Sequence, residues 1–115
     1  MTGWKIKYYT TVNLSSPVFA FIDSLSEPAQ AKVYQSFELL AEFNILLRPP
    51  LVKKLVGTPL WELRILGKDS IRIFYIAIEN QEFLVLHGFV KKKQKTPTKE
   101  LQLALIRLKE HLSRK

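Results

Sequence analysis

Three polar residues interrupt consecutive strand-like segments of the chain: Arg64, Arg72 and His87. The segments are otherwise apolar or alternating, as expected for strands of a partly covered sheet, and comprise Leu60–Leu66, Ile71–Ile78 and Phe83–Val90. Arginine forks match phosphate oxygens, and a histidine with an ordinary pKa of about 6.5 can move a proton near neutral pH. These residue types could bind and cleave an RNA phosphodiester without a metal, because the ribose 2′-hydroxyl is itself the nucleophile.

Lysines surround these three residues on both sides in the sequence. They precede the first segment and follow the third, at Lys53, Lys54, Lys91, Lys92, Lys93 and Lys95. Aromatic residues stand among them, and we take Tyr75 and Phe89 as auxiliary residues of the site. Cations interleaved with aromatics suit the backbone and unstacked bases of single-stranded RNA. The pattern therefore predicts an RNA- or ribosome-binding surface.

Strand register decides whether the three polar residues can meet, since a one-residue slip moves a side chain to the other face of a sheet. A two-residue loop at Asn80 and Gln81 places Phe74 opposite His87, so that Arg72 and His87 share a face. At the turn before Ile71, a two- or four-residue loop places Arg64 opposite Ile73. A three-residue loop with a bulge places it opposite Arg72, where the two charges need an anion between them. The sequence leaves both registers open.

Each feature also has a purely structural explanation. A lysine run commonly ends a strand in solvent, and a strand arginine commonly pairs with a carboxylate, for which Glu62 and Glu82 are available. A strand histidine is more often a hydrogen-bonded part of the fold than a catalyst. The combination of all three with a basic exit loop favours function.

Composition excludes several classes of protein. The chain has 115 residues, 47% of them hydrophobic, which predicts one folded domain over residues 1–115. Cysteine is absent, so there is no disulfide, thiolate metal site or cysteine nucleophile. Neither a metal-ligand spacing nor a glycine-rich nucleotide loop is present, and we expect no cofactor. No apolar run is long enough for a signal peptide or a membrane span, so a cytoplasmic protein is expected. The formal charge of +8 favours a polyanionic partner.

The remaining segments predict the elements that position the site. Trp4–Val12 alternates like an edge strand, and Ser16–Leu47 has caps, prolines and apolar stripes typical of a helical hairpin. Thr96 and Pro97 open a final helix that carries Leu101, Ala104, Leu105 and Leu108 on one stripe. The order is strand, helix, helix, three strands, helix. This predicts an α+β fold with a mainly antiparallel sheet packed by the hairpin and the closing helix.

The motifs KKLVGTPLWELR, RIFY and FLVLHGFVKKKQKTPTKEL occur in this order and span the central part of the chain. In this respect the chain resembles the phage-derived Gp49-like branch of the RelE/HigB toxin superfamily. The resemblance implies the same βααβββα fold. It also implies the toxin of a type II toxin–antitoxin pair, an mRNA interferase that cleaves messages on the ribosome, inhibits translation and is held inactive by a HigA-like helix-turn-helix antitoxin.

By that resemblance, Arg64 and Arg72 match phosphate-contacting arginines, and Lys91 to Lys93 match basic residues after the last strand. RelE proper has a tyrosine near the start of its last helix, where this chain has Thr96–Pro97–Thr98. His87 is therefore assigned as general acid or base, with Tyr75 as the substitute. Two other classes stay open: a non-catalytic RNA- or DNA-binding module on the same fold, and a basic interaction protein that binds an acidic partner.

Overall fold

The computed structural model describes residues 3–65, 67, 69–92 and 94–114. The elements in chain order are β1 (Lys5–Tyr8), α1 (Pro17–Asp23), α2 (Glu27–Phe43), the 3-10 turn η1 (Asn44–Leu46), β2 (Val52–Lys54), β3 (Trp61–Ile65), β4 (Ile71–Ile78), β5 (Glu82–Val90) and α3 (Thr98–Ser113). The α+β prediction is confirmed. The order of elements predicted from the sequence lacked β2, because this strand has only three residues and is too short to show an alternating pattern.

The helical hairpin begins where the caps predicted it. The Ser16 side chain accepts a hydrogen bond from the Phe19 backbone N–H, and Ser26 does the same for Ala29, so each satisfies an otherwise free amide of the first turn. The helix α2 ends at Phe43, before the predicted end of the hairpin at Leu47, because Asn44 takes a positive φ of 41°. No helix in the described ranges is long and apolar enough to cross a membrane.

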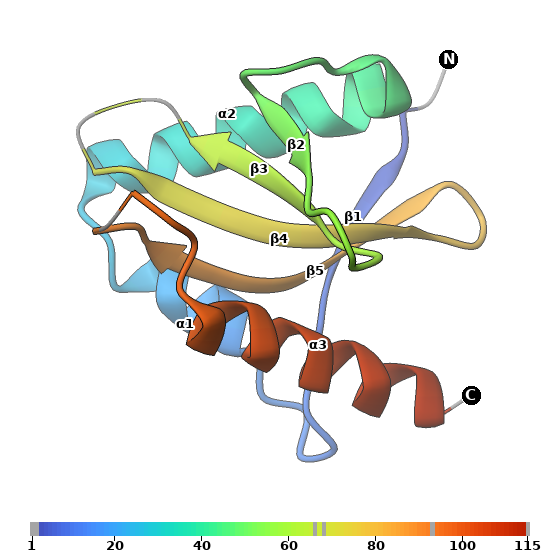
Figure 1. The fold of residues 1–115 in the computed structure, drawn as a ribbon. Helices are drawn as coiled ribbons and strands as arrows, with labels where there is room; N and C mark the ends of the chain where they lie inside the picture. The colour runs from blue at the N-terminus through green and yellow to red at the C-terminus, as the bar shows by residue number, and fades with distance from the viewer. Residues whose placement is uncertain (1–2, 66, 68, 93, 115) are drawn as a thin grey trace.

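The five strands form one sheet in the order β1-β5-β4-β3-β2. The edge strand β1 runs parallel to β5, and the other pairs are antiparallel. In Figure 1, α2 passes behind β2 and β3, whereas α3 runs along the opposite side of the sheet next to β5. The predicted strand over Trp4–Val12 is shorter than expected but lies at an edge, as predicted.

Two apolar clusters cover the two faces of the sheet. One joins α1 and α2 to side chains such as Ile73 and Val85, and the other joins α3 to side chains such as Phe74 and Leu86. Because both faces are covered near the middle of β4 and β5, polar side chains there are buried or emerge only at the margins of α3. The α3 margin is where Arg64, Arg72 and His87 lie.

A β-bulge in β5 turns His87 toward α3. Phe74 pairs with His87, but Tyr75 pairs with Val85, which leaves Leu86 as the extra residue. The connecting loop is three residues, Glu79 to Gln81, rather than the predicted two, since Ile78 pairs with Glu82. The bulge adds one residue to β5 and so offsets the one extra residue of the loop. The predicted pairing of Phe74 with His87 is therefore confirmed, although the route to it differs.

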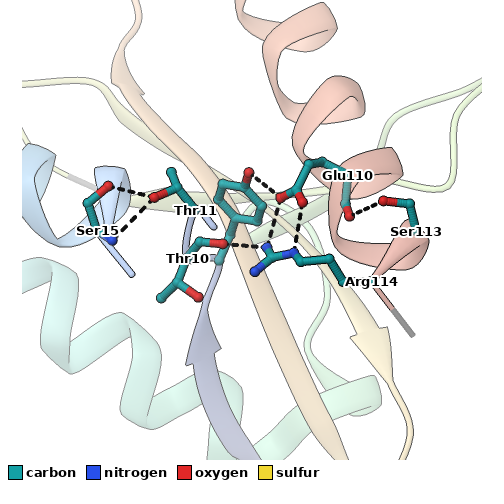
Figure 2. A network of polar contacts seen from close by, with 7 residues as sticks. Thr10, Thr11, Ser15, Glu110, Ser113 and Arg114 are labelled. Atoms are coloured by element: carbon teal, nitrogen blue, oxygen red, sulfur yellow. Dashed lines mark hydrogen bonds and ion pairs between the residues drawn. The ribbon is translucent and has the colours of Figure 1, made fainter. Parts of the chain in front are cut away.

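The far end of α3 is fixed to the chain segment after β1. The Tyr9 hydroxyl donates to Glu110 Oε1 at 2.7 Å, and Arg114 Nε lies 2.8 Å from Glu110 Oε2. Figure 2 shows Arg114 reaching from Glu110 to the backbone carbonyl of Thr10, while Ser113 lies beside Glu110. These contacts hold the C-terminal end of α3 against the segment after β1.

Candidate functional site

Arg64 and Arg72 lie directly opposite each other on β3 and β4. The register is the one that a bulged turn predicted, and it places two guanidinium groups side by side. An anion does lie with them, but it is the protein's own: Glu62 Oε1 is 3.3 Å from Arg64 Nε and 4.0 Å from Arg72 Nε. The Glu62 side chain is only 1% exposed. The arginine pair is therefore compensated without a bound phosphate, which corrects the inference that this register requires one.

Glu62 contacts both arginines and the loop before α3. Its second oxygen, Oε2, accepts a hydrogen bond from the Thr96 hydroxyl at 3.5 Å. Arg72 Nε is buried and makes no hydrogen bond, while Arg72 Nη1 donates to the Ile71 carbonyl at 3.1 Å. The carboxylate thus approaches both arginines at Nε, near the base of each guanidinium. Arg64 and Arg72 keep 29% and 16% of their side-chain surface exposed.

A recess of about 590 Å³ opens beside Arg72. It is lined by Arg72, Lys91, Lys92, Ser70 and Gln94, with no carboxylate among these residues. The Lys91 backbone N–H donates to the Ser70 carbonyl at 2.9 Å, which joins the end of β5 to the turn between β3 and β4. A polar recess with three cations matches the charge and hydrogen-bonding needs of a phosphodiester.

His87 lies on the same face but in a more enclosed position. Its ring stacks on Phe89, with centroids 5.6 Å apart and an interplanar angle of 17°. Nε2 is 2.6 Å from Glu100 Oε1, and Nδ1 is 3.0 Å from Arg107 Nη1. Both partners come from α3. The residue is 7% exposed, and both ring nitrogens already have a protein partner.

These contacts define the protonation state of His87. Arginine can only donate, so Nδ1 must accept from Arg107 and the ring proton sits on Nε2, where it is donated to Glu100. Burial lowers the pKa of His87 below 6.5, and the hydrogen bond to Glu100 acts in the opposite direction. The Arg107 charge lowers the pKa further. The geometry therefore favours a neutral ring of one tautomer.

The two auxiliary aromatic residues are on opposite faces of the sheet. Phe89 pairs with Arg72 and packs between α3 and the sheet, so it belongs to the site region. Tyr75 packs with the α1 and α2 cluster, edge-on to Phe83. Burial raises the pKa of the Tyr75 hydroxyl. Tyr75 therefore does not face the arginine pair and cannot replace His87 there.

The predicted basic residues divide between three places. Lys91 and Lys92 line the recess, and Lys95 is exposed in the loop before α3. Lys53 pairs with Glu62 and by register shares the face of Arg64, whereas Lys54 pairs with Trp61 on the other face. Lys93 lies outside the described residues.

Sequence reasoning missed the partners that α3 and its preceding loop bring to the site. Glu100 and Arg107 lie 13 and 20 residues beyond His87, and only the packing of α3 across the sheet brings them to it. Glu62, by contrast, was named from the sequence as a carboxylate that could pair with a strand arginine, and it lies two residues before Arg64 on the same face of the strand. Among the described residues, no group of three or more acidic or histidine side chains could hold a metal ion.

Comparison with known proteins identifies the fold first and the family second. A crystal structure of the archaeal RelE–RelB complex from Pyrococcus horikoshii OT3 is similar, with a TM-score of 0.61 over 79% of this chain and 98% of that chain. The sequences are 18% identical, so the similarity concerns the fold. A search of curated proteins gave no match. Residues 20–109 match the family model described as Phage derived protein Gp49-like.

The chain therefore belongs to the phage-derived Gp49-like family, a branch of the RelE/HigB superfamily of toxin–antitoxin toxins. This confirms the family and the fold that the three motifs indicated.

Proposed function

We propose that this protein is the toxin of a type II toxin–antitoxin pair and cleaves messenger RNA on the ribosome without a metal ion. The whole chain would act as one toxin domain in the cytoplasm. The observation that carries the proposal is the pairing of Arg64 with Arg72 next to a recess that Arg72 shares with Lys91 and Lys92. Such a cluster of cations has few structural uses beside the apolar cluster that α3 covers.

In this proposal the arginines act on the scissile phosphate. The attacking 2′-oxygen adds charge to the phosphorus centre, and guanidinium groups held in place beforehand stabilise that charge without reorganisation. Glu62 supports this role by approaching both arginines at Nε, and since Arg72 Nη1 donates to the Ile71 carbonyl, Arg72 Nη2 and the Nη atoms of Arg64 would contact the substrate. Lys53 and Lys95 would contact the message or ribosomal RNA nearby, an interaction that weakens with salt.

The site offers fewer groups for proton transfer than for phosphate binding. His87 can exchange a proton with RNA only if the ring leaves Glu100 or Arg107, because each nitrogen is already engaged. Lys91 and Lys92 lie in the recess itself and are the better placed donors. Alignment of the message by the ribosome would supply the rest of the rate acceleration, since correct positioning alone strongly accelerates intramolecular attack.

The partner proposed for this toxin is a HigA-like helix-turn-helix antitoxin. The test is expression of the chain alone and together with the product of the neighbouring reading frame. We expect growth arrest in the first case, growth in the second, and cut messages in a translating extract supplied with the free protein. Harmless expression of a soluble, folded chain would contradict the proposal.

A non-catalytic RNA-binding module is the second candidate. It is favoured by the enclosure of His87, whose two nitrogens are both satisfied inside the protein. The same extract separates the classes: a module of this kind would retain RNA without cutting it. A protein that only binds an acidic partner would do neither.

A further inference from the structure

A second concave surface lies on the other face of the sheet, away from the arginine pair. It is a groove of about 410 Å³ between the segment after α2 and the ends of the strands. Its floor includes Trp61, Tyr75, Ala77 and Phe83 from three neighbouring strands. Ala77 is exposed here, so α1 and α2 leave this part of the sheet uncovered. We name this surface the β2-side groove.

Apolar side chains extend the β2-side groove beyond its floor. Ile45 lines it and is 72% exposed, and the next residue, Leu46, is 64% exposed. Trp61 is 38% exposed at the strand end. Exposed apolar side chains at and beside a groove mark an interaction site more often than a chance exposure. Because Leu46 is exposed outside the lining of the groove, these apolar residues suit a macromolecular partner better than a small molecule.

The charges at the β2-side groove have one sign. Arg48 and Lys54 line it, together with Lys53 of the edge strand β2, whose side chain the register assigns to the opposite face, and no carboxylate is among its lining residues. Tyr75 is only 4% exposed, so its ring face is not free to stack with a base. Aliphatic walls with a cationic rim match a protein segment that has apolar side chains on one side and carboxylates flanking them.

We propose that the β2-side groove binds an acidic amphipathic segment of a partner protein. Under the proposed function, on which the choice of partner rests, that protein is the antitoxin. Its segment would then hold the toxin from the face opposite Arg64 and Arg72. Inhibition would follow from bulk that prevents docking on the ribosome, while the arginine pair stays uncovered.

The test compares two groove substitutions with two matched controls on α3. Ile45→Asp and Arg48→Glu alter the groove, whereas Ile106→Asp and Lys109→Glu make the same kinds of change on the other side of the sheet. Ile106 is 64% exposed, close to Ile45, and Lys109 is exposed like Arg48. All four changes are on the surface, so the variants are expected to fold, which circular dichroism checks.

Affinity for the purified product of the neighbouring reading frame is measured by calorimetry, with Arg72→Ala in every protein to remove toxicity. We expect Kd to rise at least about tenfold for each groove variant, as for a central interface residue, and to stay within about twofold for the controls. Kd of the parent should also rise with salt. In the otherwise active chain, Ile45→Asp should cut messages normally but escape rescue by the partner.

Equal Kd values for groove variants and parent would overturn the proposal, as would the absence of any complex. A loss confined to the α3 controls would place the partner on the opposite face. Loss of RNA retention by Arg48→Glu, with partner binding intact in both groove variants, would make the groove an RNA surface instead. Growth arrest by the parent is scored separately. Its absence would remove the toxin function, while the calorimetry would still decide what the groove binds.

Discussion

Replacing Glu62 by glutamine tests whether one buried carboxylate organises the arginine pair. The substitution keeps the shape of the side chain and removes its charge. A unit charge pair at 4 Å gains about 4 kcal/mol at an effective dielectric constant near 20, and Glu62 has Arg64 at 3.3 Å and Arg72 at 4.0 Å. Part of this attraction offsets the cost of burying the carboxylate, which is 1% exposed.

Removing the charge leaves Arg64 and Arg72 facing each other uncompensated, and the loss of one partner from a buried ion pair typically costs about 3–5 kcal/mol. Because both arginines are partly exposed to water, we expect about 2–4 kcal/mol for Glu62→Gln. Urea denaturation at neutral pH measures the free energy of unfolding.

The matched control is Glu82→Gln. Glu82 lies 3.8 Å from Lys7, whose side chain is 56% exposed, so this surface pair should contribute less than about 1 kcal/mol. Salt should reduce the small effect of Glu82→Gln and change that of Glu62→Gln much less. A Glu62→Gln protein that unfolds within about 0.5 kcal/mol of the parent would refute the idea that this carboxylate holds the arginines.

Three further predictions concern His87 and the packing of side chains in the core. Since burial lowers the folded pKa of His87 below 6.5, the unfolded chain binds a proton first as pH falls, and stability should drop below about pH 6.5 by up to about 1.4 kcal/mol per pH unit. His87→Gln should flatten that part of the urea-derived profile, and an unchanged slope would contradict the lowered pKa and the neutral ring assigned to His87. Gly88→Ala should cost about 1–3 kcal/mol, because the added Cβ would lie 2.7 Å from the Phe21 ring. Recovery in the double variant with Phe21→Leu would identify that contact, whereas additive losses would not. Phe37→Ala, at 5% exposure, should cost about 3–5 kcal/mol, and an unchanged melting temperature would count against its place in the core.

The sequence predicted the elements that local signals define. Ser16 and Ser26 occupy the cap positions that their neighbouring prolines indicated, and the apolar runs of β4 and β5 are the central strands. The facing of Arg64 and Arg72 was one of two registers left open. It depended on the turn before Ile71, whose conformation no local pattern specifies.

Features that depend on long-range packing were beyond the sequence. The bulge at Leu86 places Leu86 and His87 on the same face, and alternation of apolar residues cannot locate it in a strand that is apolar on both sides. The partners Glu100 and Arg107 reach His87 only because α3 crosses the sheet in one orientation. A histidine that the sequence made a candidate acid or base is consequently buried among its own partners.

Primer extension on a message translated in vitro tests the central claim most directly. The parent, Arg72→Ala and the control Lys109→Ala are each added to the translating extract after circular dichroism shows a native fold. Arg72 lines the basic recess, whereas Lys109 is exposed on α3, and both substitutions remove one positive charge. We expect new 3′ ends with the parent and Lys109→Ala, and a loss of at least about a hundredfold with Arg72→Ala. Cutting by Arg72→Ala at the parent's rate would contradict the phosphate clamp and place the chemistry elsewhere on the protein.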